Sequence, residues 1–108
     1  MHLLPRPFDL IKSGEKTVEI RLNDEKRRMI AVGDTIVFTR LPDNAEKLTV
    51  TVAGLHPYPT FRELYGAVPF SDFGCGGMTM DELIESTYIL YSPEREKTYG
   101  ALGIRIKR

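Results

Sequence analysis

Alternation of polar and apolar residues is the strongest pattern in this chain, and it predicts short strands with one buried face. Residues 17–22 show it most clearly. Their apolar face comprises Val18, Ile20 and Leu22, and their polar face comprises Thr17, Glu19 and Arg21. Similar patterns predict further strands over residues 2–4, 35–39, 48–52 and 101–106, the run at 48–52 continuing loosely toward His56.

Short helices are predicted between these strands from the residues that start and stop helices. Pro5 and Pro7 suit a first helical turn, which Ser13 and Gly14 would end. Thr60 and Glu63 form a capping-box pattern for a second helix, which we expect Gly66 to stop.

The second half of the chain carries two more helix signals. A capping-box pattern at residues 79–82 predicts a helix through about Tyr91. Ser92 and Pro93 predict a further helix that Gly100 closes. The basic residues 26–28 are expected in a loop, and residues 69–77 in an irregular glycine-rich segment.

About five short strands with small inserted helices do not fit the long-helix alternation of a parallel sheet. The pattern favours an α+β, mainly β, fold: a small mixed or antiparallel barrel. With 108 residues, 42% apolar and 28% charged, the chain has the length and composition of one globular domain over residues 1–108.

Charge is balanced overall but segregated along the chain. Fifteen basic and fifteen acidic residues cancel, so no overall positive field would attract nucleic acid from a distance. The first quarter nevertheless concentrates the cations Lys12, Lys16, Arg21, Lys26, Arg27 and Arg28. A local basic cleft is therefore compatible with the sequence.

Several kinds of site and location are not expected. Apolar runs are too short to cross a bilayer, and no leader pattern begins the chain, so we expect a cytoplasmic protein without a membrane contact. His2 and His56 lack the spacing of metal ligands, and no phosphate-binding glycine loop is present, so no metal or cofactor is expected. Cys75 has no evident partner and is interpreted as an inert packing residue.

The stretch 13–22 concentrates the candidate chemistry. By pattern alone, Glu19 and Arg21 are the solvated face of an amphipathic strand. A lysine, a carboxylate and an arginine at a helix-to-strand junction could also hold a nucleobase and a phosphate. Lys16 and Glu19 would point to opposite faces of a regular strand, so they can converge only if Lys16 lies at a bend.

The pattern Gly14-x-Lys16-x-x-Glu19-x-Arg21 resembles the signature of ASCH domains, with Pro7-Phe8 before it and Gly33-Asp34 after it. The resemblance spans nearly the whole chain, and the later segment from Tyr88 to Gly100 resembles small stand-alone members. It implies a PUA-like barrel with an RNA-binding cleft beside the first helix.

Some similar small members are amidohydrolases acting on N4-acetylcytidine, with a lysine and a threonine of this motif and a downstream glutamate as catalytic residues. Lys16 matches the lysine, whereas Glu19 occupies the threonine position and Gly76 the glutamate position. With two of three positions changed, catalysis would have to use Glu19 as a general base and Lys16 as its partner.

Our leading hypothesis is therefore a domain that binds RNA or a modified nucleoside through Lys16, Glu19 and Arg21. Lys16 and Arg21 would hold phosphate or carbonyl oxygens, and Glu19 would accept from an exocyclic amine or orient water. Aromatic residues that could stack on bases are Tyr88, Tyr91 and Tyr99. The alternatives are an amidohydrolase on an acylated nucleoside and a module that binds a protein partner.

Overall fold

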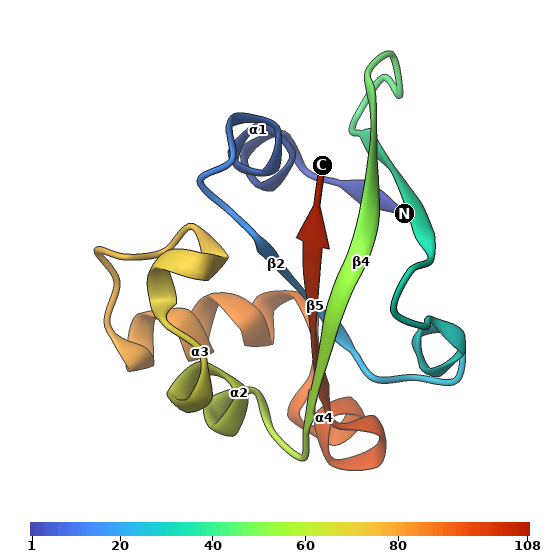
Figure 1. Ribbon diagram of the computed structural model, residues 1–108. Coiled ribbons are helices and arrows are strands. Elements are labelled where there is room, and N and C mark those ends of the chain that lie inside the picture. The colour runs from blue at the N-terminus through green and yellow to red at the C-terminus, as the bar shows by residue number, and fades with distance from the viewer.

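Five strands form one mixed sheet in the order β1-β3-β4-β5-β2 in a computed structural model that describes residues 1–108 (Figure 1). The strands are β1 (His2–Leu3), β2 (Val18–Leu22), β3 (Thr35–Arg40), β4 (Lys47–Tyr58) and β5 (Ala101–Lys107). β1 pairs in parallel with β3, and the other neighbours are antiparallel. The expected α+β class with five strands is confirmed.

The sheet curves into a half-barrel of the PUA-like kind, because the long β4 pairs with β3 along its first part and with β5 along most of its length. A register shift between Val52 and Gly54 allows this bend. β1 and β2 stand at the two ends of the strand order and are not paired with each other. The Arg21 side chain spans this seam by donating to the His2 carbonyl oxygen at 3.0 Å.

Four helices and two short 3₁₀ helices connect the strands. They are α1 (Pro5–Ser13), η1 (Arg27–Met29), α2 (Phe61–Ala67), η2 (Phe70–Phe73), α3 (Met80–Leu90) and α4 (Pro93–Tyr99). Gly14 ends α1 in the left-handed conformation, and Thr79 with Glu82 forms the complete capping box of α3, both as predicted. Gly66 does not stop α2, which continues to Ala67, and Arg27 and Arg28 of the basic run lie in η1 rather than in a loop.

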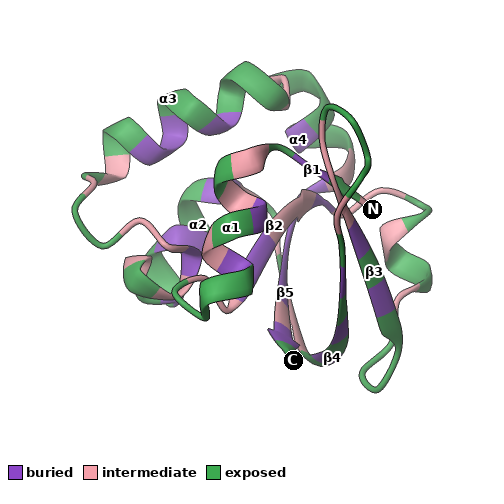
Figure 2. Ribbon diagram, turned by 90° about the horizontal axis from the view of Figure 1, so that it is seen from above, coloured by how far each residue is buried: buried purple, intermediate pink, exposed green.

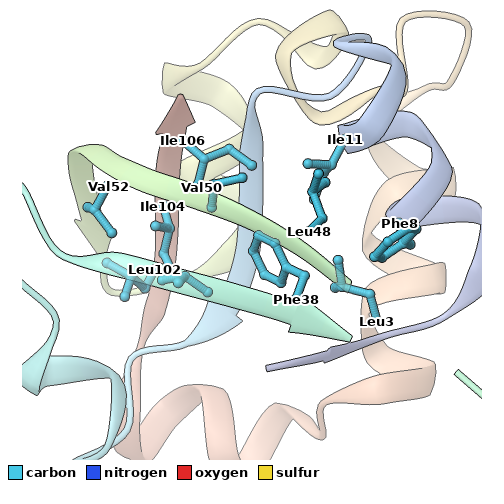
Figure 3. Packing of buried hydrophobic residues seen from close by; sticks show 11 residues of the cluster. Leu3, Phe8, Ile11, Phe38, Leu48, Val50, Val52, Leu102, Ile104 and Ile106 are labelled. Atoms are coloured by element: carbon cyan, nitrogen blue, oxygen red, sulfur yellow. The ribbon is translucent and has the colours of Figure 1, made fainter. Parts of the chain in front are cut away.

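Two hydrophobic cores lie on the two faces of the sheet. The first fills the half-barrel and is covered by Phe8 and Ile11 of α1 (Figure 3). The second packs α2, η2 and α3 against Val18 and Leu22 of β2. Buried and exposed positions alternate in β3 and in the first half of β4, whereas β5 is buried along most of its length because both of its faces are covered (Figure 2). β2 contributes no side chain to the first core, and its other face carries Glu19 and Arg21 instead.

Candidate functional site

A cleft of about 590 Å³ opens between α1, β2 and α3. Its lining includes Arg6 and Leu10 of α1, Glu19 and Arg21 of β2, and Leu90 of α3. Leu4, before α1, and the loop after η2 complete the walls. The lining is largely apolar, with a few charged groups, which is typical of a small-molecule or base-binding site.

Lys16, Glu19 and Arg21 meet in this cleft. Glu19 is 4% exposed as a residue, and the Lys16 Nζ lies 3.0 Å from its carboxylate oxygen Oε1. Arg21 donates through Nη2 and Nε to the other oxygen, Oε2, at 2.9 and 3.1 Å. The Ile20 backbone N–H also donates to Oε1, at 3.0 Å. Both carboxylate oxygens therefore accept from two donors each.

Lys16 reaches Glu19 because it precedes the regular part of β2, which begins at Val18. Its backbone N–H donates to the Leu10 carbonyl at 3.0 Å, which ties this residue to α1. Lys16 therefore lies at a bend before the regular strand, as its convergence with Glu19 requires. Gly74 keeps this corner open: a Cβ there would lie 3.0 Å from Leu10 Cδ1 and 3.3 Å from Lys16 Cβ.

The interpretation of Glu19 and Arg21 as a solvated strand face is wrong. Their side chains are only 5% and 13% exposed. The alternation correctly predicts a strand with one polar and one apolar face. It does not show whether other elements cover the polar face. Here β1 and α1 close over that face from the opposite edge of the sheet, which makes it the floor of the cleft.

Electrostatics keep Glu19 ionised. Burial is the largest influence on the pKa of Glu19 and raises it, but the charges of Lys16 and Arg21 and the hydrogen bonds from Lys16 and Ile20 together outweigh burial. The pKa is therefore lowered from its ordinary value of 4.5. Two cations and one anion leave the floor with an excess positive charge. The hydrogen-bond donors of the floor that remain available to a ligand are on Lys16 and on the Arg21 Nη1, which has no partner within the protein.

A buried pair of hydroxyl groups in the cleft was not identified from the sequence. Tyr65 and Thr87 share a 2.6 Å hydrogen bond between their hydroxyls, and both line the cleft. Burial raises the pKa of Tyr65 to about 12, so its phenol is neutral. These residues occupy ordinary apolar-face positions of α2 and α3, which gave no signal of a role.

Cys75 also lines the cleft. Burial raises the pKa of its thiol, although the charges of Lys16 and Arg6 act in the opposite direction. A raised pKa leaves little thiolate at neutral pH, and the thiolate is the nucleophilic form.

The three tyrosines that were candidates for base stacking lie in different parts of the structure. Tyr91 lines the cleft and stacks on Phe61 with ring centroids 5.7 Å apart. Tyr88 points elsewhere and donates to Glu96 Oε1 at 2.7 Å. Tyr99 lies at a shallower depression with Lys97. Tyr91 alone of the three therefore joins Lys16, Glu19 and Arg21, and Gly76 offers no side chain there.

No group of three or more His, Cys, Asp and Glu side chains is arranged to hold a metal ion. No helix has the length and apolar character needed to span a bilayer.

The half-barrel with its cleft beside α1 defines an α+β protein of the PUA-like class. The ASCH domain profile matches residues 1–108 in full, and the chain belongs to the ASCH domain family. This confirms the resemblance carried by the Gly14-to-Arg21 motif.

Two solved structures are similar over nearly their whole length. The crystal structure of the hypothetical protein PH0355 has a TM-score of 0.88 and 36% sequence identity, covering 99% of this chain and 94% of that chain. The solution NMR structure of protein PF0455 from Pyrococcus furiosus has a TM-score of 0.76 and 34% identity, covering 99% of this chain and 93% of that chain. No curated protein sequence gave a significant match.

Proposed function

We propose that the cleft binds RNA or a modified nucleoside, with Lys16 and Arg21 donating to phosphate or carbonyl oxygens of the ligand. The supporting observation is the saturated Glu19 carboxylate, which orients both cations and leaves their remaining donors for a ligand. Membership of a family associated with RNA binding agrees with this. Glu19 itself then positions the cations, because its oxygens already accept from four N–H groups.

The walls of the cleft suit a nucleobase. Leu10, Leu90 and Tyr91 present apolar and aromatic surface around the charged floor, and aromatic side chains stack on unpaired bases in RNA-binding sites. A cleft of about 590 Å³ lies within the usual range of small-ligand sites. Tyr91 is the aromatic residue we assign to stacking, since Tyr88 and Tyr99 lie outside the cleft.

The alternative function, hydrolysis of an acylated nucleoside, is favoured by the 3.0 Å contact between Lys16 and Glu19. Two observations weigh against it. A general base works best with a pKa near the working pH, whereas the pKa of Glu19 is lowered. Gly76 also supplies no carboxylate at the position of the downstream glutamate. Binding without hydrolysis is the function that this geometry supports better.

Binding is tested by titrating a fluorescein-labelled, mixed-sequence RNA hexamer and following its anisotropy. Substitution Lys16→Gln should weaken binding about tenfold or more, because it removes a buried charge-assisted donor worth about 1.5 to 3 kcal/mol. Lys97→Gln, which removes an exposed charge at the other depression, is the matched control. Equal affinity of the two variants would refute binding in the cleft.

Hydrolysis is tested by incubating the protein with N4-acetylcytidine and following the release of cytidine. We expect no turnover above the uncatalysed rate. Cytidine release by the native protein that is abolished in Glu19→Gln would instead establish the amidohydrolase alternative.

A further inference from the structure

Three hydroxyl groups carried by α2 and α3 line one wall of the cleft. They belong to Tyr65, Ser86 and Thr87. A hydroxyl group has a single proton to donate and two lone pairs with which to accept. The partner that receives each proton therefore decides what this wall can offer to a ligand.

The proton of the Thr87 hydroxyl is committed to the backbone. Its Oγ1 lies 2.7 Å from the Leu83 carbonyl oxygen, and a carbonyl oxygen can only accept. The same Oγ1 lies 2.6 Å from the Tyr65 hydroxyl, so the proton in that contact must come from Tyr65. Burial raises the pKa of Tyr65 to about 12, so this proton is present at neutral pH. Tyr65 and Thr87 therefore keep only lone pairs for a further partner.

Ser86 has the same hydrogen-bond character nearer to solvent. Its Oγ donates to the Glu82 carbonyl oxygen at 2.8 Å and lies 3.2 Å from that of Leu83. Tyr65 and Thr87 are buried and Ser86 is exposed, so acceptors run from the interior of the cleft toward its mouth. We call these three hydroxyl groups the acceptor wall.

The floor of the cleft has the opposite hydrogen-bond character. Lys16 and Arg21 can only donate, and both oxygens of Glu19 already accept from donors of the protein. The cleft therefore presents donors on the β2 side and acceptors on the α2 and α3 side. A ligand that satisfies both sides presents acceptors to the floor and an N–H or O–H group to the acceptor wall.

We propose that Tyr65, with its proton directed to Thr87, is a specificity-determining residue that selects a heterocyclic ligand with an amino group over one with a carbonyl oxygen at the same position. This inference rests on the proposed function of the cleft and deepens it. Cytosine and adenine carry an exocyclic amino group beside a ring nitrogen that accepts. In uracil and hypoxanthine a carbonyl oxygen replaces the amino group, and the ring nitrogen carries a proton. That exchange turns an oxygen toward the acceptor wall and an N–H toward the cations of the floor.

Isothermal titration calorimetry with four nucleoside 5′-monophosphates tests this selectivity. Cytidine and uridine monophosphate form one pair, and adenosine and inosine monophosphate form the other, so each amino compound has an oxo partner of nearly the same shape. In the pair that binds more tightly, the native protein should favour the amino compound about tenfold or more. The reason is that a carbonyl oxygen facing Tyr65 leaves buried acceptors without a donor.

Two variants separate this selectivity from a purely structural role. Tyr65→Phe removes one acceptor and should lower the amino-to-oxo affinity ratio about three- to tenfold. Thr87→Val removes the acceptor of the Tyr65 proton, so Tyr65 becomes able to donate to a carbonyl oxygen. The oxo compound should then bind more tightly than it binds to the native protein. A variant that only loosened the packing would weaken both compounds of a pair alike.

Thr98→Val is the matched control. The Thr98 hydroxyl donates to the Glu94 carbonyl oxygen four residues earlier, at 3.1 Å, as Thr87 does to Leu83, but Thr98 is exposed on α4 and lies outside the cleft. Circular dichroism checks that each variant is folded.

An affinity ratio near one in the native protein would overturn the role given to Tyr65, as would equal ratios in Thr87→Val and Thr98→Val. If Lys16→Gln still weakens binding of all four monophosphates in that case, the cleft function survives without the selectivity. Absence of any binding that responds to Lys16→Gln would overturn the proposed function as well, so the two failures are distinguishable.

Discussion

At the scale of single residues, Glu19 is the side chain on which the candidate site depends. Burying an isolated carboxylate costs several kcal/mol, so such groups persist only when paired and hydrogen-bonded. Glu19 meets both conditions through Lys16, Arg21 and the Ile20 backbone. The same contacts hold Lys16 and Arg21 in place without a ligand, so the floor of the cleft is already organised when a ligand arrives.

Substitution Glu19→Gln should destabilise the protein by about 3 to 5 kcal/mol, because two largely buried cations would lose their counter-ion. Urea unfolding followed by circular dichroism measures the loss. Glu85→Gln, an exposed change on α3, should stay within about 0.5 kcal/mol of the native protein. Similar midpoints for both variants would contradict the central role given to Glu19.

The residues of the site differ in how clearly the sequence marks them. Lys16, Glu19 and Arg21 are brought together by the structure and belong to the family motif, whereas the strand pattern alone placed Glu19 in solvent. Tyr65 and Thr87 gave no signal, because a buried hydroxyl pair looks like any apolar helical position. Of the three candidate tyrosines, only the fold could separate Tyr91 from the others.

At the scale of elements, Glu96 of α4 connects three helices. Its Oε2 accepts from the Phe61 backbone N–H at the start of α2, at 2.8 Å. Its Oε1 accepts from the Tyr88 hydroxyl of α3, at 2.7 Å. Glu96 is 7% exposed, and from a distant part of the chain it supplies an acceptor for the first N–H of α2, beside the Thr60 side chain that caps the Glu63 N–H. This contact helps to set the position of α3, which is one wall of the cleft.

Substitution Glu96→Gln should therefore cost about 1 to 3 kcal/mol, because it replaces two hydrogen bonds to a carboxylate by weaker bonds of a neutral amide. Tyr88→Phe, which removes one of the two hydrogen bonds and leaves Phe61 satisfied, should cost about 1 kcal/mol. Thermal unfolding of both variants beside the native protein provides the comparison. A larger loss in Tyr88→Phe than in Glu96→Gln would show that the contact to α2 has little weight.

Signals from neighbouring residues in the sequence predicted the helix ends well, and where they failed, tertiary packing is the cause. Helix caps depend on adjacent residues, so Gly14 and the capping box of Thr79 were identified from sequence. Gly66 was expected to end α2, but the buried residues Leu64 and Tyr65 anchor this helix in the second core, and it continues one residue past the glycine. Packing outweighs the modest propensity cost of a glycine, about 1 kcal/mol.

At the scale of the whole molecule, the class of fold was predictable, but the place of the cleft was not. Short strands, turns and caps sufficed for a mixed barrel. The cleft, however, is lined by α1, β2 and α3, which are separated along the chain by up to about two thirds of its length. The seam between β1 and β2 also depends on the strand order, which no local pattern determines. The family motif identified the floor residues without that information.

The stability of the whole molecule should fall at both ends of the pH scale, for reasons that trace to two buried groups. The pKa of Glu19 is lowered in the folded protein. Its contribution is therefore present above its ordinary value of 4.5 and is lost as the pH falls below that value. The pKa of Tyr65 is raised from 10 to about 12, so its contribution is complete below about pH 10 and is lost between 10 and about 12.

Urea midpoints measured from pH 3 to 12 test this profile. A shift of about two units on Tyr65 corresponds to about 2 to 3 kcal/mol of stability. Tyr65→Phe, which cannot ionise, should therefore show a flatter alkaline limb, and Glu19→Gln a flatter acid limb. Glu19→Gln should change the alkaline limb only slightly, because burial is the largest cause of the raised pKa of Tyr65 and the charge of Glu19 is a smaller one. Tyr65→Phe with an unchanged alkaline limb would mean that another phenol, such as that of Tyr91, whose pKa is also raised by burial, dominates there.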